Sequence, residues 1–321
     1  MVQALTALAG AVALTASLAL SPAQAQDQFK VAIGQINNWE NQAPTLGEQF
    51  FKKHNLALES FGTAGAGETM QPVISASADF GAGVGVAGAM RAFARGAPVR
   101  VLLPAFTGTG DLYWYVKADS PIKSLQDATG SNTIAYSTSG SSSNNIVIAF
   151  VEELGTKAKP TATGSPPATL TAVMSGQIDI GWAAPPFALR ERQENKITIV
   201  ARAREATELA DQTIRVNIAS VEALKTKRAA ITRLMQVYDR AIKWAYANAK
   251  SIDYFAESAK APRDIAKQAV DEFFPQSALQ IGEIRGLDMT LRDALQYKFI
   301  NAAMTPKDIE PLFDILYKPA R

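Results

Sequence analysis

Short apolar segments alternate along the chain with segments whose apolar residues recur at helical spacing. Near the start, residues 29–33 and 56–61 are predicted as strands and residues 45–53 as a helix. Asn55 follows that helix, and asparagine tolerates the left-handed backbone with which helices commonly end. Strands that alternate with helices predict parallel pairing through helical crossovers, which is an α/β fold.

The same alternation continues through the rest of the chain. Further strands are predicted at residues 99–103, 112–116, 133–136, 197–200 and 214–219. Helices are predicted at residues 144–154 and 170–174. From residue 221 onward the pattern is largely helical, and residues 231–247 are strongly amphipathic.

One pattern recurs 100 positions later in the chain. The first copy has Val73, Ser75, Asp79 and Gly81, and the second has Val173, Ser175, Asp179 and Gly181. Each copy predicts a helix end, a short strand centred on the aspartate, a glycine turn, a helix that carries Arg91 or Arg190, and a strand. We expect the aspartates to cap the backbone and the arginines to offset helix dipoles. The repeat predicts two similar α/β lobes, each a mostly parallel sheet flanked by helices, with a ligand cleft between them.

The start of the chain has the pattern of an export signal. Residues 1–25 are apolar and rich in small side chains, and they end in Ala23-Gln24-Ala25, a typical cleavage site. A membrane-spanning helix is the alternative, because the apolar run is of about spanning length. We assign residues 26–109 to the first part of lobe 1, residues 110–213 to lobe 2, and residues 214–321 to the return into lobe 1 and the C-terminal helices.

The composition argues against several classes of function. The chain has no cysteine and one histidine, so we expect no thiol chemistry, no histidine-based triad, no metal and no cofactor. The formal net charge of +2 over 321 residues does not favour nucleic acid as a partner. An exported chain without cysteine fits the periplasm of a Gram-negative cell.

Residues 83–88 match G-x-G-x-x-G, the dinucleotide-binding fingerprint. That fingerprint also needs an acidic residue about 20 positions on, after the following strand. Here the strand at residues 99–103 leads into Pro104, Ala105 and Phe106 instead. The match therefore predicts a glycine-rich turn before a helix, a place that suits a ligand of any kind.

Several segments in a fixed order resemble one family. They are Gln35, residues 75–85, residues 107–115, the block KADSPIKSLQDATGSNTIAYSTSGSSS at residues 117–143, and Pro166-Pro167-Ala168 followed by SGQIDIGWAAPPF. The chain resembles the type II periplasmic substrate-binding proteins of ABC importers, in the branch that binds alkanesulfonates, taurine and thiamine precursors. His54 and Asn55 replace the turn glycine that is usual in that family. Enzymatic relatives depend on a cysteine-rich segment, so we do not expect this chain to be an enzyme.

The resemblance implies a monomeric receptor whose two lobes close on a small-molecule anion. The permease and ATPase of an ABC importer would then read the closed form. In such folds the ligand lies at the carboxyl ends of the strands. We therefore expect it to contact Gln35, Asn37, Trp39, Gly65, Gly83, Gly85, Thr107, Ser139, Gly140, Ser141, Ser142, Trp182 and Arg215.

The serine-rich turn at residues 137–143 precedes a predicted helix. Free N–H groups at a helix start, together with hydroxyl donors, form an anion site. The position of Gly140, Ser141 and Ser142 in the family supports this interpretation. The alternative is an ordinary helix cap, because serine is a common N-cap residue.

The other side chains in the predicted site also have structural alternatives. Trp39 and Trp182 would stack on an apolar part of the ligand or fill the core. Arg215, on the returning strand, would bind the ligand or form a surface or interlobe ion pair. Cleft-facing tryptophans would favour a ligand with an organic body over a bare inorganic ion.

The predicted function is a periplasmic receptor that delivers a small organic anion to an ABC importer. Sulfonates come first, then carboxylates, then nitrate or bicarbonate. The alternatives are a receptor for a thiamine pyrimidine precursor and an enzyme of the same fold, which would need a nucleophile or redox group that the sequence does not supply. A ligand-sensing partner of a membrane kinase is a third hypothesis, which neighbouring permease and ATPase genes would distinguish from transport.

Overall fold

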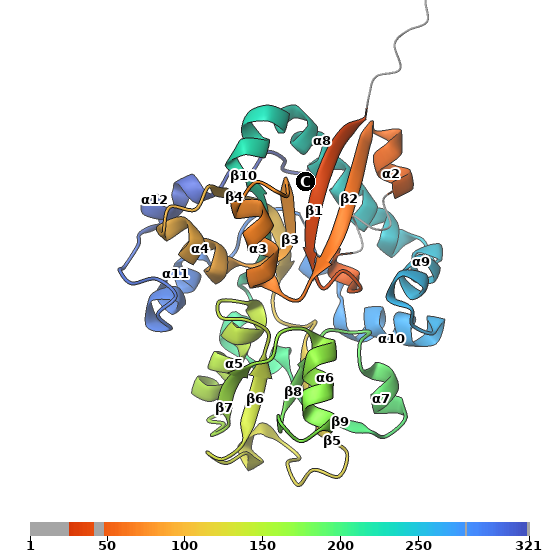
Figure 1. Ribbon diagram of the computed structural model, residues 1–321, viewed down its shortest axis with the longest axis vertical. Coiled ribbons are helices and arrows are strands. Elements are labelled where there is room, and N and C mark those ends of the chain that lie inside the picture. Colours follow the sequence, from red (N-terminus) through yellow and green to blue (C-terminus); the bar gives the residue numbers. More distant parts are fainter. Residues whose placement is uncertain (1–25, 42–47, 280, 320–321) are drawn as a thin grey trace, which may run out of the picture.

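A computed structural model of the chain describes residues 26–41, 48–279 and 281–319. The chain forms two lobes stacked along the long axis of the molecule and joined by crossover segments (Figure 1). The predicted signal peptide, residues 1–25, lies outside the described residues. So does the predicted start of the first helix, which is described as α2 (Glu48–Lys53).

Lobe 1 is built on a five-stranded sheet in the order β2-β1-β3-β10-β4. β1 pairs in parallel with β2 and β3, whereas β10 runs antiparallel to both β3 and β4. The strands are β1 (Asp27–Gly34), β2 (Leu56–Thr63), β3 (Phe80–Gly85), β4 (Val99–Thr107) and β10 (Thr213–Ser220).

The two faces of this sheet pack against different helices. Val31 and Ile33 of β1 belong to the cluster that contains the apolar side of α8 (Val221–Ala247). Ala32, which points to the other face, packs with residues of α3 (Ala66–Ile74) and α4 (Val86–Ala94). Alternate side chains of a strand point to opposite faces, so the central strands are apolar on both sides.

Lobe 2 repeats this arrangement. β6 (Thr133–Tyr136) pairs in parallel with β7 (Lys159–Ala162), and β5 (Tyr113–Lys117) runs antiparallel between β8 (Gly181–Ala183) and β9 (Ile197–Arg202). A bridge from Ile134 to Ile180 connects the two pieces. The order β7-β6-β8-β5-β9 is therefore the counterpart of β2-β1-β3-β10-β4, with one antiparallel strand at the same place. The helices are α5 (Ser142–Glu153), α6 (Pro166–Met174) and α7 (Leu189–Gln193).

The internal repeat extends further than its sequence pattern indicated. The hydroxyls of Thr63 and Thr69 lie 2.6 Å apart in lobe 1, and those of Thr163 and Thr169 lie 2.6 Å apart in lobe 2. The predicted order of helix, strand, helix and strand is confirmed in both copies, but Gly81 and Gly181 lie within the strands β3 and β8 and not in turns after them.

One detail of the repeat was wrong, because both aspartates precede their strands instead of lying at the centre. Asp79 accepts the backbone N–H of Lys30 at 3.0 Å, and Asp179 accepts that of Thr133 at 2.8 Å. Each carboxylate thus satisfies a backbone amide of a neighbouring strand, Lys30 within β1 and Thr133 at the start of β6, which fits the expected capping role.

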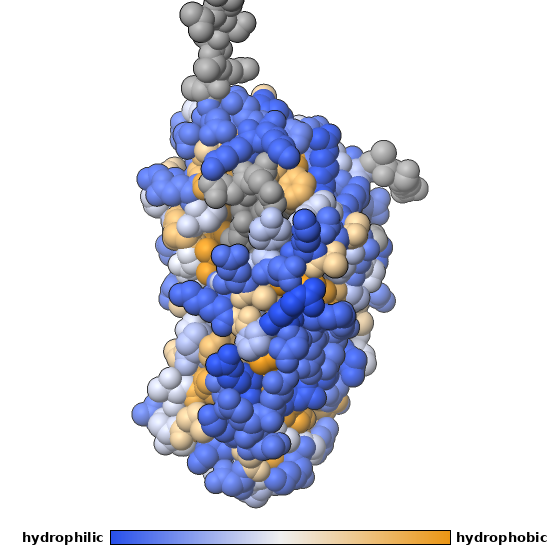
Figure 2. Space-filling view, turned by 90° about the vertical axis from the view of Figure 1, so that its right-hand side faces the viewer, coloured by the Kyte–Doolittle hydropathy of each residue, from blue (hydrophilic) through white to orange (hydrophobic). Residues whose placement is uncertain are grey.

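The remaining helices belong to the C-terminal part of the chain. They are α9 (Lys250–Ala259), α10 (Arg263–Phe273), α11 (Leu287–Gln296) and α12 (Pro306–Ile309). The crossovers run from the end of β4 to the start of β5 and from the end of β9 to the start of β10. The lobe boundaries near Thr109 and Thr213 stay predictions. The face in Figure 2 is largely hydrophilic on both lobes, with apolar residues in small separate spots.

Candidate ligand cleft

A cavity of about 190 Å³ lies between the lobes. Lobe 1 contributes the turn after β1, from Gln35 to Asn38, and Thr63 at the end of β2. Lobe 2 contributes the start of α6 and Ala184 and Phe187 after β8. The lining side chains are uncharged, so this cavity suits the body of a small organic molecule, held by amide and hydroxyl groups.

A second cavity, of about 260 Å³, adjoins the first because Asn37 and Phe187 line both. It contains charged side chains: Arg190 and Glu191 from lobe 2 and Lys260 from lobe 1. The two cations outnumber the one carboxylate, so this second cavity is slightly positive. Arg190 and Lys260 are exposed, and solvent therefore screens their attraction for a ligand.

The turn after β1 has an unusual backbone. Gln35 adopts a φ of 59°, in the left-handed region that residues other than glycine seldom occupy. The Asn38 carboxamide accepts the N–H of Glu40 at 2.7 Å and so holds the turn in shape. Strained backbone of this kind often marks a binding site.

The start of α6 offers few donors to the cleft. Ser165 caps the helix by accepting the N–H of Ala168, and Pro166 and Pro167 have no N–H to offer. A helix start usually attracts anions through these free N–H groups. Because two of them are missing here, this wall of the cavity is better suited to an apolar part of the ligand.

Arg215 lies in a buried ion-pair network where the crossovers meet lobe 1. Its Nε donates to the Glu40 carboxylate at 2.7 Å, and its Nη2 pairs with Asp111. Its Nη1 donates to the Ser142 hydroxyl of lobe 2 at 2.9 Å. The guanidinium therefore contacts two carboxylates and one hydroxyl. Of the alternatives for Arg215, these contacts match the interlobe pairing.

This network holds one more negative than positive charge. Burial raises the pKa of Glu40 to about 7, because Arg215 is shared with Asp111 and offsets only part of the cost of desolvation. Burial alone would lower the pKa of Arg215, but the attraction of Asp111 and of Glu40 raises it. Arg215 therefore stays charged, whereas burial shifts Glu40 towards its protonated form.

The serine-rich turn of lobe 2 is buried except for Ser139 and half-buried Thr138. Ser141 caps α5 by accepting the N–H of Asn144 at 3.1 Å. The turn contacts lobe 1 directly, because a Cβ added at Gly85 would lie 2.5 Å from the Gly140 carbonyl oxygen and 3.1 Å from the Ser142 nitrogen. The start of α5 therefore faces the backbone of lobe 1 in this structure, and anion binding at the turn stays a prediction.

Both tryptophans of the predicted site are core residues here. Trp39 is 2% exposed and packs edge-on against Tyr246 and Phe255. Trp182 is fully buried and pairs across the sheet with Trp114. Neither lines the two cavities of the cleft, and a stacking role for them stays a prediction.

The other predicted residues lie close to the crossovers or to the facing lobe. Gly65 precedes α3 and is buried against Ser137 of lobe 2. Gly83 has a φ of 71°, and its N–H donates to the Asn217 carboxamide. The Thr107 hydroxyl lies 3.1 Å from that of Thr213, which links the two crossovers.

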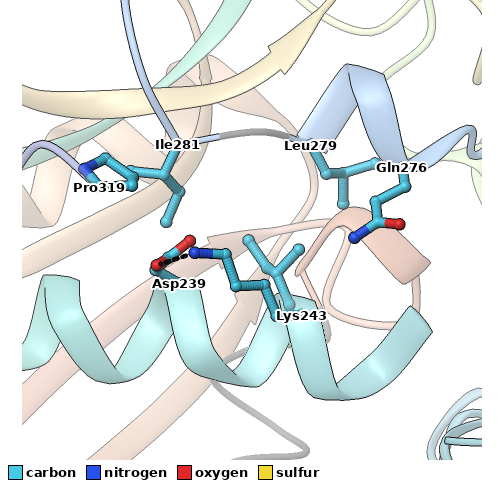
Figure 3. Close-up of a pocket in the computed structure, with 7 residues that line it drawn as sticks. Asp239, Lys243, Gln276, Leu279, Ile281 and Pro319 are labelled. Atoms are coloured by element: carbon cyan, nitrogen blue, oxygen red, sulfur yellow. Dashed lines mark hydrogen bonds and ion pairs between the residues drawn. The ribbon is translucent and has the colours of Figure 1, made fainter. Parts of the chain in front are cut away.

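A further cavity, of about 200 Å³, lies within lobe 1 (Figure 3). Asp239 and Lys243 of α8 form an ion pair of 2.8 Å on one side, and Leu279, Ile281 and Pro319 lie opposite. Lobe 2 does not contribute to its lining. Closure of the lobes would not enclose a ligand there, so the interlobe cleft is the stronger candidate site.

Comparison with known families adds to this geometry. The model of the NMT1/THI5-like family matches residues 45–252, which is more than half of the chain. The chain belongs to the NMT1/THI5-like family. Comparison with curated protein sequences gave no significant match.

Solved structures share the two-lobe fold of this NMT1/THI5-like protein over nearly its whole length. The alkanesulfonate-binding protein of Xanthomonas axonopodis pv. citri, bound to MOPS, has a TM-score of 0.73 at 16% identity and covers 91% of this chain and 99% of its own. The ligand-binding component of an ABC-type import system from Staphylococcus aureus has a TM-score of 0.72 at 14% identity, with coverages of 91% and 98%. The nitrate-binding protein of Synechocystis PCC 6803 has a TM-score of 0.67 at 13% identity, with coverages of 90% and 86%. At these identities the likeness shows the fold.

Several side chains at the cleft and at the contact between the lobes were not predicted from the sequence. Glu40 and Asp111 are buried carboxylates with no local motif around them. Arg91 was expected only to offset a helix dipole, but it donates to Ser139 of lobe 2. Phe187 ends a segment that resembles the family, and nothing else in the sequence indicated that its side chain lines the cleft.

The described residues contain neither a membrane-spanning helix nor a metal-binding cluster. In residues 26–41, 48–279 and 281–319, no helix is both long and apolar enough to cross a membrane. In the same part of the chain, no three acidic or histidine side chains come together in a way that would hold a metal ion.

Proposed function

We propose that this NMT1/THI5-like protein is the solute-binding receptor of an ABC importer and that it captures a small organic anion. The observation that carries the proposal is the cavity between the lobes, lined from both sides and spanned by two crossovers. A ligand that contacts both lobes stabilises the closed arrangement, which a permease can distinguish from the open one. The solved neighbours described as binding components of importers support this role.

The lining of the cleft supports an anion with an organic body. Phe187 and Pro166 supply apolar surface in the cavity whose lining side chains carry no charge. Arg190 and Lys260 would meet an anionic group in the adjoining charged cavity. This division favours sulfonates and carboxylates over nitrate, which has no apolar part.

Export to the periplasm and delivery by a monomer to a permease and ATPase belong to the same proposal. They rest on the apolar start of the chain and on the resemblance to periplasmic receptors. No cofactor and no chemical conversion of the ligand are needed for this role.

The proposal is tested by ligand binding to the chain from residue 26 onward. Thermal shift followed by calorimetry would compare alkanesulfonates and carboxylates of increasing chain length with a thiamine pyrimidine precursor, nitrate and sulfate. Binding to the folded state raises the melting temperature by mass action. We expect a shift that grows with the apolar length of the anion, and no turnover of the bound compound.

Variants connect that binding to the cleft. Phe187→Ala should lower the affinity for the best-binding organic anion by about tenfold, because an aromatic contact in the cavity is lost. Lys243→Ala, in the separate cavity of lobe 1, is the control and should bind normally. A shift from nitrate alone, or from cations alone, would contradict the proposed ligand class.

A further inference from the structure

Glycines at two helix starts of lobe 1 meet the serine-rich turn of lobe 2. At the start of α3, the Gly67 N–H donates to the Thr138 hydroxyl at 3.3 Å. On α4, a Cβ added at Gly85 would lie 2.5 Å from the Gly140 carbonyl oxygen, and one added at Gly88 would lie 3.0 Å from it. A side chain at position 85 would overlap the turn, and one at position 88 would press on it, so the turn would have to shift by a few tenths of an ångström.

The local backbone does not explain glycine at either position. Gly85 has φ −61° and ψ 129°, which any residue can adopt. Gly88 lies inside α4, where alanine is more favourable than glycine. Only Gly83, with its φ of 71°, is required by the turn itself. The second and third glycines of G-x-G-x-x-G therefore serve the contact with the other lobe.

Arg91 continues the same face of α4. Positions 85, 88 and 91 are three residues apart, so they lie along one side of the helix. Arg91 donates from Nη1 to the Ser139 hydroxyl at 3.0 Å and from Nη2 to the Ser139 carbonyl at 2.9 Å. Two donors on one residue fix both the position and the orientation of the turn.

We propose that the G-x-G-x-x-G stretch is the closure contact of this receptor, in which Gly85 and Gly88 leave space for the turn at residues 137–142 and Arg91 positions the turn there. The proposal rests on the proposed function in one respect, because a receptor of this kind closes to retain its ligand. It assigns the glycine motif to contact between the lobes and not to binding of a phosphate.

The test measures closure directly. The chain has no cysteine, so spin labels on Glu59→Cys in lobe 1 and Lys157→Cys in lobe 2 report one distance between the lobes. We expect part of the ligand-free population to show the separation of this structure, in which the lobes touch, and a bound anion to enlarge that part. Gly88→Ala should reduce the closed population about tenfold, because the added methyl group overpacks the contact. Gly85→Ala should have a larger effect, and Arg91→Gln should broaden the closed distance.

Gly130→Ala is the matched control, because a Cβ there would meet nothing within 4 Å. Gly88→Ala should also keep or raise the melting temperature, since alanine favours the helix, and this separates lost closure from lost folding. A wild-type distribution without the closed separation would overturn the proposal. So would a Gly88→Ala distribution equal to that of Gly130→Ala.

The same labelled proteins separate this inference from the proposed function. If Gly88→Ala opens the lobes but no organic anion binds the wild type, the ligand class is wrong and the closure contact stands. If an organic anion binds and closes wild type and Gly88→Ala equally, the receptor stands and the closure contact is wrong.

Discussion

Glu40 is a buried carboxyl group that faces Arg215, Asp111 and the hydroxyl end of Tyr238. Its pKa in the folded chain is about 7, above the ordinary value of 4.5. Between these two values the folded chain holds a proton that the unfolded chain has released. The stability that Glu40 contributes is therefore complete below the ordinary pKa and is lost as the pH rises through the folded pKa.

Glu40→Gln should remove this pH dependence. Between about pH 5 and about pH 7.5 we expect the wild type to lose more stability than the variant, by on the order of 1–3 kcal/mol. Urea unfolding of both proteins at the two pH values measures the difference. The remaining titrating groups are common to both chains, so their effects largely cancel, and equal pH slopes would contradict the raised pKa.

At the scale of secondary-structure elements, local pattern predicted most strands and helices, but it missed β7 (Lys159–Ala162), whose sequence KPTA has little apolar alternation. The strand predicted at residues 133–136 is β6 (Thr133–Tyr136), because apolar alternation and turn residues act within a few positions. Contacts between elements carry no such signal. Arg215 and Glu40 are 175 positions apart, and Arg91 and Ser139 are 48 apart. The fold class and the repeat could thus be predicted, and an interlobe ion pair was one of the alternatives for Arg215. The partners Glu40 and Asp111 and the contact of the turn with lobe 1 could not be predicted.

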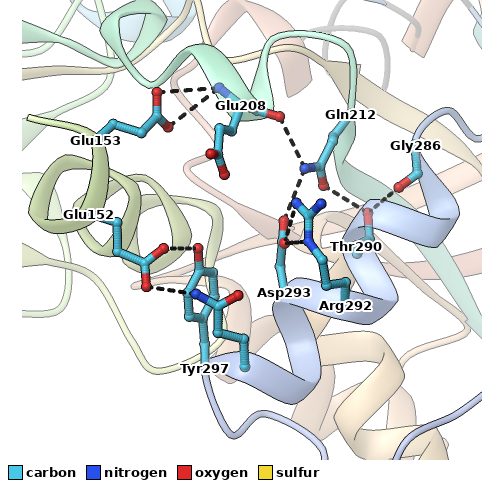
Figure 4. Close-up of polar contacts among 10 residues, drawn as sticks. Glu152, Glu153, Glu208, Gln212, Gly286, Thr290, Arg292, Asp293 and Tyr297 are labelled. Atoms are coloured by element: carbon cyan, nitrogen blue, oxygen red, sulfur yellow. Dashed lines mark hydrogen bonds and ion pairs between the residues drawn. The ribbon is translucent and has the colours of Figure 1, made fainter.

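Helices α5 and α11 are connected across the lobes by a small polar contact (Figure 4). Glu152 of α5 accepts the Tyr297 hydroxyl at 2.7 Å and the Gln296 carboxamide N–H at 2.9 Å. The neighbouring Glu153 bonds instead to Thr207 within lobe 2. Adjacent carboxylates of one helix therefore serve different partners.

A double-mutant cycle tests the connection between α5 and α11. Glu152→Ala and Tyr297→Phe should each lower the free energy of unfolding only slightly, because the pair is largely solvent-exposed. The coupling energy between the two substitutions should be about 0.5–1 kcal/mol. Glu153→Ala with Tyr297→Phe is the control and should be additive. Urea unfolding of the single and double variants gives both coupling energies, and a coupling of Glu152 no larger than that of Glu153 would argue against the contact.

At the scale of the whole molecule, the two lobes share one hydrophobic core. Residues of both belong to the same buried cluster. Tyr113 of β5 packs against Phe273 of α10 with ring centroids 5.6 Å apart, and Arg202 of β9 stacks on the same ring at 4.5 Å. A core that continues through the crossovers predicts that the lobes unfold together, although they move relative to each other in function.

The four tryptophans make this testable, since Trp39 and Trp244 lie in lobe 1 and Trp114 and Trp182 lie in lobe 2. In a Trp39→Phe, Trp244→Phe background, fluorescence reports lobe 2 while circular dichroism reports the whole chain. We expect the urea transitions of the two probes to coincide. Arg215→Met should lower the free energy of unfolding reported by each probe by about 3–5 kcal/mol, because it leaves two buried carboxylates unpaired. Arg263→Met, which breaks an exposed pair with Asp253, should change stability by less than about 1 kcal/mol. Separate transitions, or a shift in only one probe, would mean that the lobes fold as independent units and that the network of Arg215 stabilises only one of them.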